Sequence, residues 1–324
     1  MPILRNAISE LRRVLTPRAP GVVLALGGGG AGGLAHIGVI QVLSENNVHV
    51  RAVVGTSIGA EIGAFYASGM SGDELVAVAT EFDWKQTLAL FVPDLPTGGI
   101  VSGIRILDFL RGKLGTRRIE DLPIRFAAMA VDLESGDEVV LDSGDLVEAV
   151  RASVSLPGLI APHKLNGRAL VDGGVLNPLP FDVARERFGE PVIAVAVQRS
   201  VRTPLPPPTP QWLARVDQLL QQPWMEHAPG LRAWLSGQLE SRRAGQNIEP
   251  AWTTRRVLDR VFEMSQAQIV RLRQQRHPPE VMIVPDVGDI GPLEFYRAGE
   301  AIAAGRRAAE AQLPQIMKLA RVAA

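Results

Sequence analysis

The sequence contains no cysteine, and its charges cancel, since 34 Lys and Arg stand against 34 Asp and Glu in 324 residues. The absence of cysteine excludes disulfides, thiolate metal sites, iron–sulfur clusters and thiol nucleophiles. A net charge of zero argues against a chain that mainly coats a polyanion. Aromatic residues make up only 5%, whereas hydrophobic residues reach 46%, which is typical of a globular protein with a substantial core.

Long apolar runs are also missing, because the longest ones have the size of a strand and fall well short of the ~18–20 residues that span a bilayer. Arg5, Arg12 and Arg13 interrupt the segment that a secretory signal would need. We therefore expect a cytoplasmic protein without a signal peptide or transmembrane helix. Residues 1–20 place apolar side chains at helical spacing beside arginines. That pattern fits either a helix docked on its own domain or a basic amphipathic segment at a membrane surface.

From residue 21 onward, apolar strands alternate with helical segments. A strand over 22–26, a glycine loop, a helix over 34–45 and a strand over 50–54 form a parallel βαβ unit. Further strands are expected over 124–133, 138–141, 169–172, 191–197 and 281–284. This alternation predicts an α/β fold with a central, largely parallel sheet.

The composition changes at residue 201, where five prolines in 201–210 indicate a linker. Residues 211–276 look helical and arginine-rich, and they hold four of the five tryptophans. These tryptophans fit a lid that opens against lipid and ordinary core packing equally well. We predict an N-terminal basic segment, a catalytic core, a helical insertion or lid, and a closing strand and helix, over 1–20, 21–200, 201–280 and 281–324.

The first chemical motif is a glycine loop, G-G-G-G-A-G-G over residues 27–33, between a strand and a helix. Glycines expose backbone N–H groups, and a helix N-terminus adds positive potential, so the loop suits an anion or a developing oxyanion. The loop also matches a dinucleotide-binding pattern. That pattern needs an acidic residue at the end of the second strand, which here ends in Gly55-Thr56.

The second motif is Gly55-Thr56-Ser57-Ile58-Gly59, a G-x-S-x-G that follows a strand and precedes a helix. A turn of this kind presents the serine hydroxyl at the edge of the sheet. Because parallel neighbouring strands place their following loops at the same edge, Ser57 should face the glycine loop. A base for Ser57 is available in Asp172, at the end of another strand, whereas the five histidines fit poorly.

In their order along the chain, four blocks resemble those of the bacterial patatin-like phospholipases; they are residues 27–38, 55–59, 152–162 and 170–180. The resemblance implies a three-layer α/β/α patatin-like fold and a catalytic dyad, with Ser57 as nucleophile and Asp172 as base. It implies an acyl-serine intermediate and lipid ester substrates such as phospholipid, lysophospholipid or another fatty-acyl ester, with no cofactor and no metal. The oxyanion hole would be the amides of Gly28, Gly29 and Gly30, and the supporting glycines would be Gly33, Gly55, Gly59, Gly173 and Gly174.

One departure from the family pattern is Gly32, where the family usually has Arg or Lys. It motivates a first alternative, a catalytically weak or inactive lipid-binding or regulatory protein that keeps the fold. A second alternative is an α/β-hydrolase with a Ser-Asp-His triad, for which His277 is the best available histidine. An acyltransferase would use the same intermediate as a hydrolase.

The neutral total hides an uneven distribution of charge. Residues 1–20 carry a net charge of +3, 21–200 carry −7, 201–280 carry +4, and 281–324 are neutral. An acidic core flanked by basic segments suits peripheral contact with an anionic membrane. The sequence offers no aromatic and basic stripe for nucleic acid and no metal-ligand cluster, so neither partner is expected.

Overall fold

The computed structural model describes residues 21–81, 84–94, 98–197, 236 and 254–322. The chain divides into two compact units, residues 1–200 with 264–324, and residues 201–263. The predicted segment 1–20 and most of the predicted insertion lie outside the described residues. The sheet and the candidate site belong to the first unit.

The sheet has eight strands, and five of them run parallel to one another. In spatial order these five are β3 (Arg125–Asp132), β2 (Val50–Thr56), β1 (Val22–Leu26), β7 (Val192–Val195) and β8 (Val281–Ile283). The antiparallel strands are β4 (Glu138–Leu141) and β6 (Arg168–Asp172), which pair with β3, and β5 (His163–Leu165), which pairs with β6. The prediction of a largely parallel sheet is therefore confirmed.

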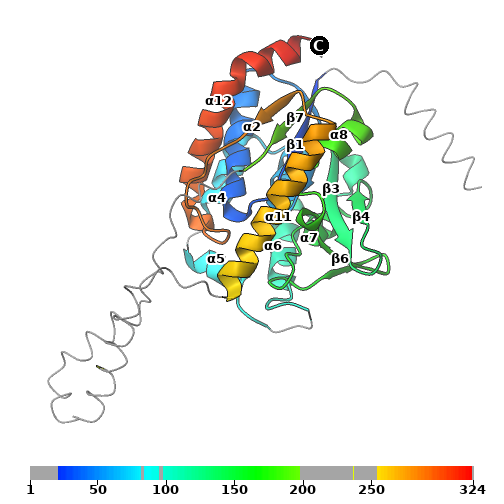
Figure 1. The fold of residues 1–324 in the computed structure, drawn as a ribbon, viewed down its shortest axis with the longest axis vertical. Helices are drawn as coiled ribbons and strands as arrows, with labels where there is room; N and C mark the ends of the chain where they lie inside the picture. Colours follow the sequence, from blue (N-terminus) through cyan, green and yellow to red (C-terminus); the bar gives the residue numbers. More distant parts are fainter. Residues whose placement is uncertain (1–20, 82–83, 95–97, 198–235, 237–253, 323–324) are drawn as a thin grey trace, which may run out of the picture. The chain divides into compact units, whose positions relative to one another are not determined.

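Helices cover both faces of this sheet (Figure 1). On β1, Val22, Leu24 and Leu26 belong to one buried cluster, whereas Val23 and Ala25 belong to another on the opposite face. Burial on both faces explains why this strand is apolar throughout. The first cluster includes side chains of α2 (Ala35–Glu45), α3 (Ile58–Ala67), α4 (Gly72–Thr80), α6 (Ile104–Leu114), α7 (Leu146–Ser153) and α12 (Ala298–Val322).

The opposite cluster includes α8 (Phe181–Phe188) and Val270 of α11 (Thr254–Arg276). These two layers of helices confirm the three-layer α/β/α prediction. A short helix, α5 (Trp84–Leu90), lies between α4 and α6 in the chain. Among the described helices, none is long and apolar enough to cross a membrane.

The register of the sheet places the ends of β2 and β6 close together. Thr56 pairs with Met129 of β3, and Asp172 pairs with Ala130, the next residue on the same strand. Only β3 therefore separates the residue before Ser57 from Asp172. Neighbouring strands lie about 4.8 Å apart, so side chains that extend toward one another at this edge can meet.

Candidate active site

Ser57 sits on a sharp turn between β2 and α3. Its backbone has φ 57° and ψ −127°, a left-handed conformation that costs a non-glycine residue about 1–3 kcal/mol. The turn is possible because Gly59 lets α3 approach β1 closely. A Cβ on Gly59 would lie 2.3 Å from the Leu26 carbonyl oxygen. Glycine at position 59 therefore allows this close approach.

The glycine loop faces Ser57 across this edge of the sheet. A Cβ placed on Gly28 would lie 3.6 Å from the Ser57 Cβ. Gly30 has φ 57°, and a Cβ there would lie 2.5 Å from the Pro292 carbonyl oxygen. The loop continues into a short 3-10 helix, Gly30–Leu34, and then into α2. The structure therefore brings the nucleophile motif and the predicted anion loop together.

The amides of the loop are not equivalent. The Gly28 N–H donates to the Pro178 carbonyl at 3.0 Å. Among the described residues, neither the Gly29 nor the Gly30 N–H donates to a backbone carbonyl. Of the three amides that the sequence proposes, these two are the available donors. Gly29 is the N-cap and Gly30 the first residue of the 3-10 helix, where N–H groups have no partner within the helix.

His36 contacts the glycine loop, and in the described part of the chain its side-chain hydrogen bond goes to Gly27, not to Ser57 or Asp172. Its ring is fully buried, and its Nε2 is 2.8 Å from the Gly27 carbonyl oxygen. Burial lowers the pKa of His36 to about 4, although the Gly27 hydrogen bond opposes this. The imidazole is therefore neutral at ordinary pH, and Nε2 carries the proton that the carbonyl accepts. This position agrees with the expectation that the histidines are poor candidates for the base.

Asp172 ends β6 and is only 2% exposed. Its Oδ1 accepts a hydrogen bond from the Gly174 N–H at 2.7 Å. Burial raises the pKa of Asp172 to about 6, although the nearby Ser57 side chain and the Gly174 N–H lower it. The carboxyl is thus more basic than an exposed aspartate and still ionised at neutral pH. Gly173 fits the turn closely, since a Cβ there would lie 2.6 Å from the Met129 carbonyl oxygen.

Two further serines contact the backbones of Ser57 and Asp172. The hydroxyl of Ser153 accepts a hydrogen bond from the Ser57 N–H at 3.0 Å. The Ser155 carbonyl accepts one from the Asp172 N–H, also at 3.0 Å. Both serines are fully buried. Ser153 is the last residue of α7 and Ser155 lies two residues beyond it, and no sequence motif marks either residue.

Glu61 is a second carboxyl close to the nucleophile. It lies one turn along α3, where its N–H donates to the Ser57 carbonyl at 3.1 Å, and its side chain is half-buried. Burial raises the pKa of Glu61 to about 7. Sequence reasoning did not single out this residue, because an isolated glutamate in a helix carries no motif.

The remaining predicted positions are also accounted for. Gly32 is buried, and a Cβ there would lie 3.0 Å from Val287 Cγ2 and 3.3 Å from Val197 Cγ1. A basic side chain at position 32 would therefore have to displace this packing.

His277, the histidine considered for a triad, lies between α11 and β8 and is exposed, and its carbonyl accepts a hydrogen bond from Arg185. Within the described residues, no group of three or more His, Asp or Glu could hold a metal ion.

The chain matches known proteins over most of its length. A family model described as patatin-like phospholipase matches residues 24–185. An uncharacterized NTE family protein of Mycobacterium tuberculosis is 34% identical over 330 residues, which cover 91% of this chain and 91% of that protein. A second NTE family protein of the same species is 34% identical over 314 residues, 96% of this chain and 49% of the other.

Patatin-like phospholipase domain-containing protein 7 of Rattus norvegicus is 34% identical over 203 residues, 60% of this chain and 15% of that protein. The crystal structure of VipD from Legionella pneumophila aligns with 94% of this chain and 68% of its own at a TM-score of 0.47 and 16% identity. From the family model and the mycobacterial relatives, the chain belongs to the patatin-like phospholipase family. This membership supports a lipid hydrolase as the class of activity.

Proposed function

We propose that the chain is a serine acyl hydrolase that cleaves lipid esters with Ser57 as nucleophile and Asp172 as base. The observation that carries the proposal is that the Ser57 side chain lies beside the buried Asp172 carboxyl, whose pKa burial raises to about 6. Ser57 attacks the ester carbonyl while Asp172 takes the hydroxyl proton. Collapse of the tetrahedral intermediate expels the alcohol, which takes that proton from Asp172. Water, activated by Asp172, then releases the acid from acyl-Ser57.

The amides of Gly29 and Gly30 are the donors that we assign to the tetrahedral oxyanion. Their position supports this assignment. Both belong to the loop that faces Ser57, and neither donates to a backbone carbonyl in the described part of the chain. The Gly28 amide would join them only after exchanging the Pro178 carbonyl for the oxyanion. A donor of this kind typically contributes about 3 kcal/mol to transition-state stabilisation.

The experiment that tests the proposal compares wild type with Ser57→Ala and Asp172→Asn. The substrates are soluble esters of short and long acyl chains, a lysophospholipid and phospholipid vesicles. We expect wild type alone to hydrolyse long-chain substrates. Retained hydrolysis in Asp172→Asn would disprove the dyad, and hydrolysis of short soluble esters alone would contradict a lipid substrate.

A lipid-binding protein without turnover is the second candidate, and Gly32 is the observation that favours it. It predicts that Ser57 in folded protein does not react with a fluorophosphonate probe. The proximity of Ser57 to the buried Asp172 carboxyl favours the hydrolase, and it also favours the dyad over a triad that would need the exposed His277. Covalent labelling of wild type but not of Ser57→Ala decides between the two candidates.

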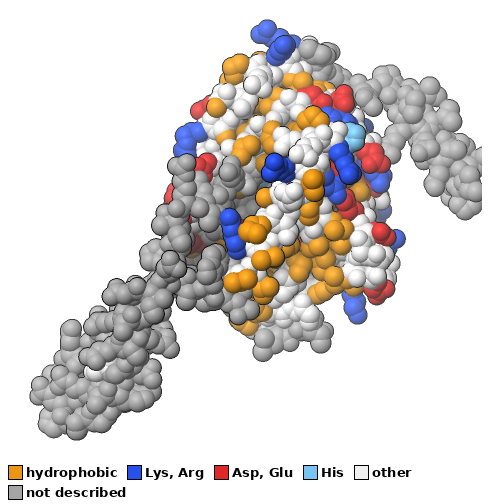
Figure 2. All heavy atoms as spheres, in the orientation of Figure 1, with side chains coloured by type: hydrophobic (Ala, Val, Ile, Leu, Met, Phe, Trp, Pro, Cys, Tyr) orange, Lys and Arg blue, Asp and Glu red, His pale blue; other side chains and the backbone are white. Residues whose placement is uncertain are grey.

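Peripheral contact with an anionic membrane completes the proposal. Several large apolar side chains of the first unit are exposed, among them Ile104 at 60% and Leu272 at 50%. Figure 2 shows hydrophobic side chains gathered on the face that α11 crosses, with Lys and Arg side chains beside them. Vesicle binding should weaken as salt increases, because charge attraction to lipid is screened. Binding that is independent of salt and lipid charge would contradict this part of the proposal.

A further inference from the structure

The backbones of Ser57 and Asp172 are both held by one short segment, Arg151 to Ser155, where α7 ends. The Ser153 hydroxyl accepts a hydrogen bond from the Ser57 N–H, and the Ser155 carbonyl accepts one from the Asp172 N–H. The nucleophile and the base come from different strands, so this segment is a direct link between them. Its geometry fixes the distance between the two catalytic groups.

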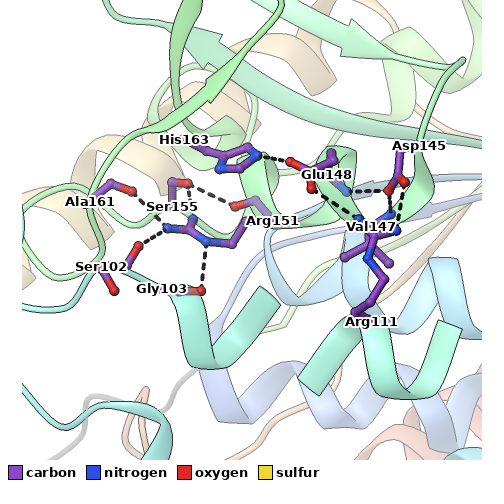
Figure 3. Close-up of polar contacts among 10 residues, drawn as sticks. All are labelled: Ser102, Gly103, Arg111, Asp145, Val147, Glu148, Arg151, Ser155, Ala161 and His163. Carbon is purple, nitrogen blue, oxygen red and sulfur yellow. Dashed lines mark hydrogen bonds and ion pairs between the residues drawn. The ribbon is translucent and has the colours of Figure 1, made fainter. Parts of the chain in front are cut away.

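Arg151 anchors this segment from within the protein. Its Nη1 donates to the Ser155 hydroxyl at 2.6 Å, and that hydroxyl donates back to the Arg151 carbonyl at 2.9 Å. Figure 3 shows the guanidinium enclosed by oxygens of two loops. It donates to the carbonyls of Ser102, Gly103 and Ala161 at 2.7, 3.2 and 3.2 Å.

The charge of Arg151 has no ion-pair partner among the described residues. The nearby carboxylate of Glu148 is bound instead by Arg111 at 3.2 Å and by His163 at 2.6 Å (Figure 3). Arg151 is 3% exposed, and burial lowers its pKa to about 10. Burying an unpaired cation costs folding free energy. We therefore expect Arg151 to have a role that a smaller or apolar side chain cannot fill. The planar guanidinium reaches four oxygens at once, which a lysine ammonium does not.

The geometry points to a brace over residues 151–155, in which Ser153 and Arg151 are positioning residues for the Ser57–Asp172 dyad. This inference rests on the proposed function. By accepting from the Ser57 N–H, the Ser153 hydroxyl keeps the Ser57 backbone at positive φ. That backbone conformation directs the Ser57 hydroxyl toward Asp172. Arg151 holds the Ser155 backbone that aligns Asp172. Loss of either contact shifts one catalytic group relative to the other, and a misplacement of about 1 Å costs about 10²-fold in rate.

The test compares Ser153→Ala, Ser153→Thr, Arg151→Lys and Arg151→Met with wild type. Arg111→Met is the matched control, because Arg111 contacts the same helix through Asp145 and Glu148 and does not touch the brace. Each folded variant is assayed for kcat, KM and the rate of fluorophosphonate labelling, with circular dichroism to normalise for folded protein. If the Arg151 variants do not fold, the two Ser153 variants decide.

We expect Ser153→Ala and Arg151→Lys to lower kcat and the labelling rate by about 10²-fold while KM changes by less than about threefold. Ser153→Thr, which keeps the hydroxyl, should recover most of the loss, and Arg111→Met should match wild type. The pH at which activity reaches half its maximum should rise in Ser153→Ala, because the displaced Ser57 side chain no longer lowers the pKa of Asp172. A general structural weakening would lower the folded fraction instead.

The brace is refuted if folded Ser153→Ala and Arg151→Lys label and turn over within about twofold of wild type. It is also refuted if Arg111→Met loses as much activity as they do. Failure of the proposed function gives a different result, because wild-type Ser57 would then not label, or Ser57→Ala would keep its activity. If wild type labels, Ser57→Ala is inactive and the variants of Ser153 and Arg151 are unaffected, then the brace is overturned and the proposed function stands.

Discussion

Replacing Asp172 by Asn should make the protein more stable and inactive at the same time. Asp172 is 2% exposed, and burial raises its pKa from the usual 3.8 to about 6. The native state therefore holds the proton more tightly than the unfolded chain does. Ionisation of Asp172 then favours unfolding, so its contribution to stability falls as pH rises from about 4 to about 6 and is constant above that.

The size of the effect follows from the two pKa values. A difference between 3.8 and about 6 corresponds to about 3 kcal/mol of native-state destabilisation once the carboxyl is fully ionised. Asparagine is neutral and has the same shape, and its carbonyl oxygen can still accept the Gly174 N–H. We expect Asp172→Asn to exceed wild type by up to about 3 kcal/mol near pH 8 and by only about 1 kcal/mol near pH 4.5.

Urea unfolding followed by circular dichroism at both pH values measures this difference. Asp137→Asn is the matched control, since Asp137 is exposed in the turn between β3 and β4 and should differ from wild type by less than about 0.5 kcal/mol. A variant that is less stable than wild type near pH 8, or a gain that does not change with pH, would refute the reasoning. Such a result would mean that Asp172 is stabilised as an anion by its hydrogen bonds more than it is penalised by burial.

Three other results are expected. Hydrolysis of a soluble ester should rise as pH increases through about 6, where Asp172 loses its proton, and Glu61→Gln should leave that midpoint unchanged even though burial raises the pKa of Glu61 to about 7. Gly30→Ala should lower kcat by about 10²-fold and also lower the midpoint of urea unfolding, because the new Cβ would lie 2.5 Å from the Pro292 carbonyl oxygen. Wild type should lose stability as pH falls below about 6.5, because the pKa of buried His36 is lowered to about 4 and protonation therefore favours the unfolded chain. His36→Gln should not show that loss; equal pH dependence of the unfolding free energy in wild type and His36→Gln would contradict this.

The first part of the site could be predicted from local sequence and one topological rule. Gly59 has to be glycine because α3 approaches the Leu26 carbonyl, and G-x-S-x-G reports that constraint directly. The glycine loop and Ser57 follow neighbouring parallel strands, so their meeting at one edge follows from the βαβ unit. Asp172 is different, because it ends an antiparallel strand; the residues alone offered it as an available base, and the resemblance to a family assigned it that role.

The supporting contacts could not be predicted, because they join residues far apart in the chain. Ser153 lies 96 residues from Ser57, and its hydroxyl gains a role only when the end of α7 meets the nucleophile turn. The same applies to the Gly28 amide, which the sequence offers as an oxyanion donor and which the Pro178 carbonyl engages. Motifs identify groups that can do chemistry, whereas the assignment of each donor to one acceptor depends on the packing of distant loops.

The energetics of the site separate the catalytic pair from its support. Ser57 is held at positive φ, and Asp172 is buried as an ionisable group, so both residues lower the stability of the native state. Ser153 does the opposite, because its hydroxyl satisfies the buried Ser57 N–H. Substitution at Asp172 should therefore raise stability while activity is lost, and substitution at Ser153 should lower both. This contrast in sign tells a reacting group from a positioning group, even where both variants are equally inactive.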